Sequence, residues 1–503
     1  MLPQPNTSWP PKVELGTWWD RLDEWEVWFS GDTMSLESFY SSRTYADANT
    51  NRFWAGVRQE KQRVLHLPAA SDVAATSASL LFSEKPVVEP AEAGEGANRL
   101  EVILEENRFD ATVLEAAEMA AALGGVYLKI DTDPQFVPTP IVVPIKPASV
   151  VPIFRRGRLW EITFWRVIKK DDSNWWYFFE ERTNPTGEEL NIRYKLFRGN
   201  EGSIGQEEEN LGAIPETQAL GLKDTTLPVP GLGVIYVPNV LPNRLLPGNP
   251  QGMSDYGSCC TLLDALDEAW TSWMRDIRMG LGKLLLDKEF LEDVDKSQFG
   301  HFQETFVMLN LGALRLGASD KYEPVKEIQF EIRHEAHLAT TTALFTEIVD
   351  RCGYNPQTFG LEIKGTAQSG TALRIRERKS MMTRQKKSRY WQWALKRLIL
   401  ELQMYDVAAG TSEVKYDPSE VTVELQDSVT PDAKEVSETV MNLRNAKVMS
   451  QEVSIRMVHP DWDDKQVKKE LTRLEGEEPE PIEPFVPGEE EEGGEENNEG
   501  DDT

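Results

Sequence analysis

The hydrophobic positions of this chain follow two periods, and the period distinguishes helical segments from strands. Residues 18–29 read WWDRLDEWEVWF, and their apolar positions recur every three or four residues, which is the spacing of one helix face. Gly31 follows as a stop signal. Other segments share this period. Helices are predicted at residues 18–29, 71–81, 99–123 (one or two helices), 262–277, 334–352, 370–402, 432–447 and 451–474.

Between residues 138 and 237 the pattern changes to short runs of aromatic and β-branched residues. LWEITFWRVI (159–168), NWWYFFEER (174–182) and IRYKLF (192–197) carry strand formers, and turn residues separate them. Strands are also predicted at 126–130 and 421–425, and a small mixed region at 284–316. The chain is therefore expected to be an α+β protein, mainly helical, with a β-rich part at about 138–237.

Length and cysteine content limit the class of protein. With 503 residues the chain has room for roughly two to four domains. Cys259, Cys260 and Cys352 are too few for a disulfide framework and fit a reducing compartment. The chain does not open with a basic start and an apolar run, and no apolar stretch reaches the roughly 20 residues of a membrane span. We therefore expect a soluble protein without a cleaved signal.

The charge is strongly negative and unevenly placed. Of the formal net charge of −30, fourteen acidic residues and no basic ones fall in residues 475–503, which leaves −16 for residues 1–474. Such a tail, rich in charge, Gly and Pro, is expected to be disordered. An acidic body disfavours tight, non-specific DNA binding, but it is compatible with a channel through which DNA passes without adhering.

Motifs of enzymes are missing from the sequence. It contains no GxxxxGK[ST] phosphate loop, no GxGxxG and no GxSxG. His334 and His337 are three residues apart on a predicted helix, but nothing nearby completes a metal site, so two ordinary histidines are the expected reading. Cys259 and Cys260 are read as small apolar residues at a helix start. We expect neither metal nor cofactor.

One basic segment stands out in this acidic chain. Between Lys364 and Arg397 there are eleven Lys and Arg residues, opposed only by Glu377. Such a segment suits an acidic partner, either nucleic acid or the acidic surface of a neighbouring subunit. Both partners remain open for the helix, and DNA is favoured for the loop that precedes it.

Five segments resemble successive motifs of one family. They are WWDRLDEWEVWFSGD (18–32), LPAASDVAATSASLLFSEKPVV (67–88), GMSDYGSCCTLLDALDEAWTSWMRD (252–276), SGTALRIRERKSMMTRQKK (369–387) and VTVELQDSVTPDAKE (421–435). Their order and spacing are similar to those of portal proteins of long-tailed phages with an SPP1-type or Gp6-type core. The resemblance covers nearly the whole chain before the acidic tail.

This resemblance implies a portal fold that assembles into a ring, usually a dodecamer. Its regions, mapped by motif, are the wing at 1–251 with the β-rich part at about 138–237, a stem helix at 252–280, the clip at 281–327, a returning stem helix at 328–352, a tunnel loop at 353–370, the long helix and wing return at 371–430, the crown at 431–474 and the disordered acidic tail at 475–503.

The function implied by the resemblance is a channel at one capsid vertex for packaging and ejection of double-stranded DNA, without sequence specificity. The implied partners are further copies of the chain, the terminase large subunit, the head-completion or adaptor protein, and the major capsid and scaffolding proteins. The implied location is the virion, and the host cytoplasm during assembly. Another structural virion protein, such as a minor head protein, is the alternative. A DNA-packaging enzyme fits less well because the phosphate loop is missing.

Two groups of residues are the candidate sites. The tunnel loop is expected to face the DNA with Lys364, Thr366, Gln368 and Ser369. The basic helix after it is expected to contact DNA or a neighbouring subunit through Arg374, Arg376, Arg378 and Lys379.

Overall fold

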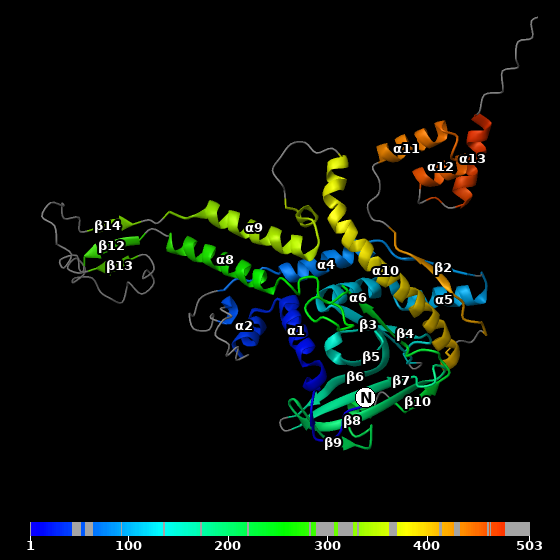
Figure 1. The fold of residues 1–503 in the computed structure, drawn as a ribbon, viewed down its shortest axis with the longest axis horizontal. Coiled ribbons are helices and arrows are strands. Elements are labelled where there is room, and N and C mark those ends of the chain that lie inside the picture. The colour runs from blue at the N-terminus through cyan, green and yellow to red at the C-terminus, as the bar shows by residue number, and fades with distance from the viewer. Residues whose placement is uncertain are drawn as a thin grey trace, which may run out of the picture. The chain divides into compact units, whose positions relative to one another are not determined.

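The computed structural model divides into two compact units, residues 1–428 and 429–503 (Figure 1). It describes residues 2–42, 52–55, 64–91, 93–133, 136–171, 174–218, 221–280, 283–287, 306–309, 325–328, 331–361, 370–411, 415–426, 433–459, 462 and 464–477.

Helices make up much of the first unit, and they confirm the predicted helical segments with somewhat wider bounds. The 99–123 segment is two helices, because Arg108 between them has a left-handed backbone with φ 44°. The helices are α1 (Lys12–Ser30), α2 (Thr33–Ser42), α4 (Ala69–Phe82), α5 (Glu95–Glu106), α6 (Phe109–Leu123), α7 (Pro215–Gln218), α8 (Cys260–Met279), α9 (His334–Cys352) and α10 (Gly370–Ala409), with 3-10 turns η1 (Pro147–Ser149) and η4 (Pro356–Phe359).

The strands confirm the β-rich segment. Its main sheet has the order β1-β9-β8-β7-β6-β5, with β10 paired to β8, and a second sheet has the order β11-β3-β4. The strands are β1 (Thr7–Ser8), β2 (Val87–Pro90), β3 (Gly125–Asp131), β4 (Ile141–Ile145), β5 (Val150–Arg155), β6 (Arg158–Lys170), β7 (Trp175–Thr183), β8 (Leu190–Asn200), β9 (Ser203–Glu208), β10 (Thr225–Leu227), β11 (Val234–Pro238), β12 (Lys283–Asp287), β13 (Phe306–Leu309), β14 (Val325–Ile328) and β15 (Val421–Glu424).

Two large hydrophobic cores connect most elements of this unit within the described residues. The first joins α1 and α4 to the bases of α8 and α9 and to one face of the main sheet, where Trp9 packs edge-on against Phe179 at a centroid distance of 4.9 Å. The second joins α4 and α6 to β3 and to the buried face of α10. Helix α4 contributes to both cores, so a short Ala-rich helix connects them, and small side chains allow the close packing that this position requires.

An antiparallel helix pair, α8 and α9, extends from these cores, and we call it the stalk (Figure 1). The chain between the two helices contains a three-stranded sheet in which β12 pairs in parallel with β13 and antiparallel with β14. The predicted small mixed region between two helices is thus present in the part that the structure describes.

The second unit is helical, with α11 (Ala433–Asn445), α12 (Gln451–Val458) and α13 (Asp464–Glu477). The sequence pattern predicted a single helix over 451–474, whereas the structure contains two. The sequence has a proline at position 460, which disfavours helical backbone in the residue before it, and His459 ends α12 with φ −128° and ψ 74°. The tail prediction falls almost wholly on residues outside those the structure describes.

Candidate functional site

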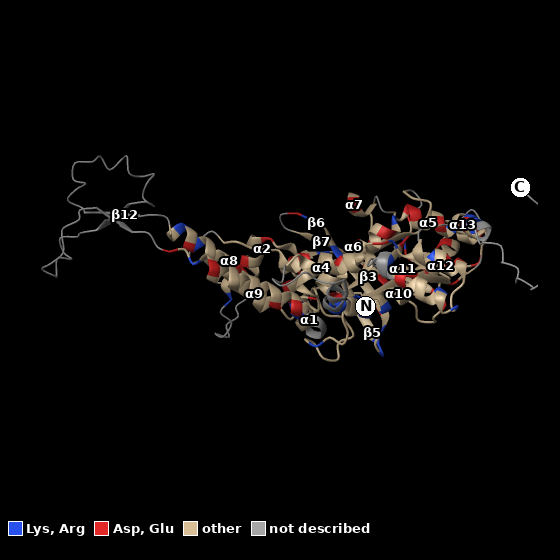
Figure 2. Cartoon of the chain, turned by 90° about the horizontal axis from the view of Figure 1, so that it is seen from above, with Lys and Arg blue, Asp and Glu red and all other residues tan. Residues whose placement is uncertain are grey.

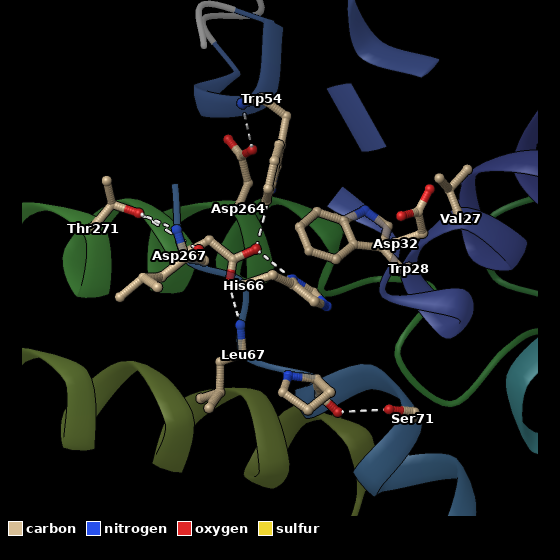
Figure 3. A network of polar contacts seen from close by, with 12 residues as sticks. Val27, Trp28, Asp32, Trp54, His66, Leu67, Ser71, Asp264, Asp267 and Thr271 are labelled. Atoms are coloured by element: carbon tan, nitrogen blue, oxygen red, sulfur yellow. Dashed lines mark hydrogen bonds and ion pairs between the residues drawn. The ribbon is translucent and has the colours of Figure 1, made fainter. Parts of the chain in front are cut away.

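Buried carboxylates on the stalk hold its base against the N-terminal part of the chain (Figure 3). Asp267 of α8 is fully buried and accepts hydrogen bonds from Trp54 Nε1 at 3.1 Å and from the Leu67 amide at 2.9 Å. The His66 ring contacts the same carboxylate through Nδ1 at 2.8 Å. One aspartate therefore fixes two segments that lie about 200 residues earlier in the sequence.

Asp264, one helical turn before, completes this attachment. Its carboxylate accepts from the amides of Phe53 at 2.8 Å and Trp54 at 3.3 Å. Burial raises the pKa of Asp264, and the two amide hydrogen bonds oppose that rise. Because positions 264 and 267 are three apart, both carboxylates lie on the same face of α8.

A second polar contact joins α8 to α9 in the outer part of the stalk. Asp276 of α8 accepts from Arg333 Nη2 at 2.7 Å and contacts His337 Nε2 at 2.8 Å. These hydrogen bonds, with that of His337 the larger, lower the pKa of Asp276. The His337 ring also stacks on Trp273 with an interplanar angle of 6°. The beginning of α9 is thereby fastened to the end of α8.

A buried lysine of α10 connects the long helix to the base of the stalk. Lys387 Nζ donates to Asp255 Oδ2 at 2.5 Å, to Ser77 Oγ at 2.6 Å and to the Tyr354 hydroxyl at 3.0 Å. The lysine and aspartate side chains are 4% and 1% exposed. Burial lowers the pKa of Lys387, and the Asp255 carboxylate opposes that shift. The contact joins α10 and α4 to the segments that precede α8 and follow α9.

Part of the basic segment therefore belongs to the fold itself, which was not predicted from the sequence. Arg384 is also buried and donates to the carbonyl oxygens of Leu80 and Gln426. The sequence contained a signal for the burial of these two side chains. Positions 384 and 387 continue the buried helical period of Trp391 and Leu395 toward the N-terminus. Basic residues on that face serve the fold and are not available to an external partner.

The predicted site residues are only partly placed. Lys364, Thr366, Gln368 and Ser369 lie outside the described residues. Arg374 and Arg376 belong to the first turns of α10, where the structure describes the helix but not these side chains. Arg378 is exposed, and Lys379 donates to Asp350 Oδ1 of the same chain at 2.6 Å. Contacts of these residues with DNA or with another subunit remain predictions.

The structure describes the surroundings of the histidines and cysteines named in the sequence analysis. His334 is 69% exposed, and His337 bonds to Asp276. Cys259 and Cys352 are buried free thiols at the base of the stalk, where a hydrogen bond with Cys352 lowers the pKa of Cys259 to about 7. No group of three or more His, Cys, Asp or Glu residues that could hold a metal ion occurs among the described residues. Nor do those residues include a helix long and apolar enough to cross a membrane.

One family of known proteins matches the sequence of this chain. The sequence profile of the family described as "Phage portal protein, SPP1 Gp6-like" matches residues 21–482. A search of curated proteins finds no match.

Three solved structures of gene transfer agent (GTA) particles are similar. A chain of "Neck of empty GTA particle computed with C6 symmetry" is 11% identical with a TM-score of 0.42, over 78% of this chain and 90% of that chain. A chain of "Virion of native gene transfer agent (GTA) particle" is 8% identical with a TM-score of 0.39, over 90% and 94%. A chain of "Neck of native GTA particle computed with C12 symmetry" is 11% identical with a TM-score of 0.36, over 90% and 95%.

Proposed function

Because the chain belongs to the SPP1 Gp6-like family of phage portal proteins, we propose that it forms a closed ring at one capsid vertex, through which double-stranded DNA is packaged and ejected. The family is one of structural particle components and not of enzymes. In the proposed ring, a dodecamer, the wing, stem, clip and crown have the boundaries given above. The ring binds the terminase large subunit during packaging and the head-completion protein afterwards.

The observation that supports this proposal most is the length of the family match. Residues 21–482 include the β-rich sheet, the stalk with its three-stranded sheet, the long helix α10 and the helical C-terminal unit. A match confined to one of these parts would be compatible with a protein that shares a module with portals. The continuous match supports a portal subunit and not a protein that shares one module with portals.

The charge of the chain suits this function. A channel has to guide a polyanion without retaining it, and each phosphate contact adds salt-dependent affinity. The net charge of −30, of which −16 belongs to residues 1–474, gives the chain an acidic balance that repels a duplex over about 8 Å at physiological salt. A few loop residues, of which Lys364 is the strongest candidate with Thr366, Gln368 and Ser369 beside it, then contact the backbone briefly. No base reading is expected, since any sequence has to pass.

Electron microscopy of the purified full-length protein tests the proposal. We expect closed rings with a central hole and no ATP or DNA hydrolysis that follows the protein through purification. A soluble monomer that never forms rings, at any protein or salt concentration, would contradict the portal function. Hydrolysis that co-purifies with the protein peak would contradict its purely structural character.

A further inference from the structure

The outward face of α10 is both basic and apolar. Six residues recur there every three or four positions, so they share one side of the helix over roughly 27 Å at 1.5 Å per residue. Trp393 is 64% exposed and Met382 50% exposed, although the opposite side of the same helix is buried in the second core. We call this face the α10 strip. Its members are Arg378, Met382, Lys386, Arg389, Trp393 and Lys396.

The cations of the strip are not paired within the part of the chain that the structure describes. None of its four Lys and Arg residues forms an ion pair with a carboxylate of the described residues, whereas their neighbours Lys379 and Arg397 pair with Asp350 and Glu401. Exposed tryptophan is also uncommon on a surface that contacts only water, and it is frequent where proteins bind each other. The α10 strip therefore has the composition of a contact surface for an acidic protein partner.

A second basic and aromatic element lies toward the same edge of the first unit. The β5–β6 hairpin turns at Arg156 and Gly157, both with positive φ, and is flanked by Arg155 and Arg158. The Arg155 guanidinium lies 5.0 Å from the ring centre of Trp160, which is 38% exposed. In Figure 2 the end of β5 and helix α10 lie toward the lower edge of the body.

Helix α5 presents acidic residues on another surface of this unit. Helix α5 packs on α6 with Leu100 and Ile103, and its outer side carries Glu95, Glu101, Glu105 and Glu106 together with Val102, which is 44% exposed. None of these four glutamates forms an ion pair within the described chain. Figure 2 shows α5 toward the upper edge of the body. It is attached to α10 beyond the strip, where Arg99 pairs with Asp406 at 2.8 Å, ten residues after Lys396. The two surfaces thus differ in charge, and each has an exposed apolar side chain among its charges.

We propose that the α10 strip of one copy binds the acidic outer face of α5 on the next copy. Two different surfaces of one subunit that complement each other give a head-to-tail interface, which closes into a ring when the rotation per subunit allows it. The inference rests on the proposed ring and adds the surfaces that build it. Charge complementarity selects a second copy as the occupant, because this chain itself supplies the acidic face.

Charge reversal on the two surfaces tests the pairing. Arg389→Glu with Lys396→Glu should raise the concentration for half-maximal ring assembly by about tenfold or more, because like charges would then face each other. Glu101→Arg with Glu105→Arg should do the same from the other side. The chain that carries all four changes should recover assembly, since the attraction is restored with the signs exchanged.

Matched controls separate this effect from a general change in charge. Lys223→Glu with Arg244→Glu alters the same net charge at exposed positions outside both surfaces and should assemble like the wild type. Sedimentation velocity measures assembly, and circular dichroism verifies that each variant is folded.

Three results would overturn the inference while the wild-type protein still forms rings, which leaves the portal function intact. The first is assembly of both double variants at wild-type concentration. The second is failure of the four-fold variant to recover although it is folded. The third is normal rings from the Arg389 and Lys396 variant that fail only in DNA packaging, which would assign the α10 strip to DNA.

Discussion

Replacing Lys387 by methionine tests whether part of the basic segment holds the body together. Methionine retains most of the side-chain length but removes the ammonium, so the Asp255 carboxylate stays buried without its cation. Asn239 Nδ2 at 2.8 Å and the Tyr354 hydroxyl at 2.9 Å remain as its donors. Removing one partner of a buried ion pair costs about 3–5 kcal/mol. We expect the free energy of unfolding to fall by that amount.

An exposed lysine outside the α10 strip provides the control. Lys223 has the same side chain but is exposed, so Lys223→Met should change the free energy of unfolding by about 0.5 kcal/mol or less. Urea unfolding at one fixed protein concentration, followed by tryptophan fluorescence, compares the two. Asp255→Asn combined with Lys387→Met should recover part of the loss, because no unpaired charge then remains. Equal stability of the two single variants would refute the structural role of Lys387.

Two further predictions concern the stalk and the channel. Asp267→Ala leaves Trp54 Nε1, the Leu67 amide and the His66 ring without their acceptor, so urea unfolding should show a loss of about 3–6 kcal/mol. Glu268→Ala, on the exposed side of the same helix, should lose less than about 1 kcal/mol, and equal losses would contradict the anchoring role of Asp267. Lys364→Asp should form normal rings but package or retain less DNA, and wild-type packaging by that variant would remove the case for a DNA-facing loop.

Much of the fold could be predicted from periodicity alone, because each long element buries one continuous side. Helix α8 follows its pattern closely, and the main sheet lies where the strand formers and turns indicated. The break after Val458 could also have been predicted from the proline at position 460, but the continuing helical pattern obscured it. Pairings between distant segments, such as β2 with β15, were not accessible because no local pattern encodes them.

The candidate site was less predictable, and the reason is physical. The identity of a lysine does not show whether its side chain is solvated or paired inside a core, so Lys386 and Lys387 could not be distinguished by residue type. Only the buried period of α10 distinguishes them. The polar residues at the base of the stalk were missed for a related reason. Asp264 and Asp267 sit within a helix rich in charge, and their amide and indole donors come from segments without a motif.

The attachment at the base of the stalk also sets an order for folding during synthesis. The amide of Phe53 bonds to Asp264, which lies 211 residues later in the chain. At 5–20 residues per second, a ribosome needs about 10–40 s to make that span. During this interval Trp54 and His66 have no native partner from α8, so the N-terminal helices emerge before the surface that completes their core. The nascent chain is then expected to need protection from aggregation until α8 has left the ribosome.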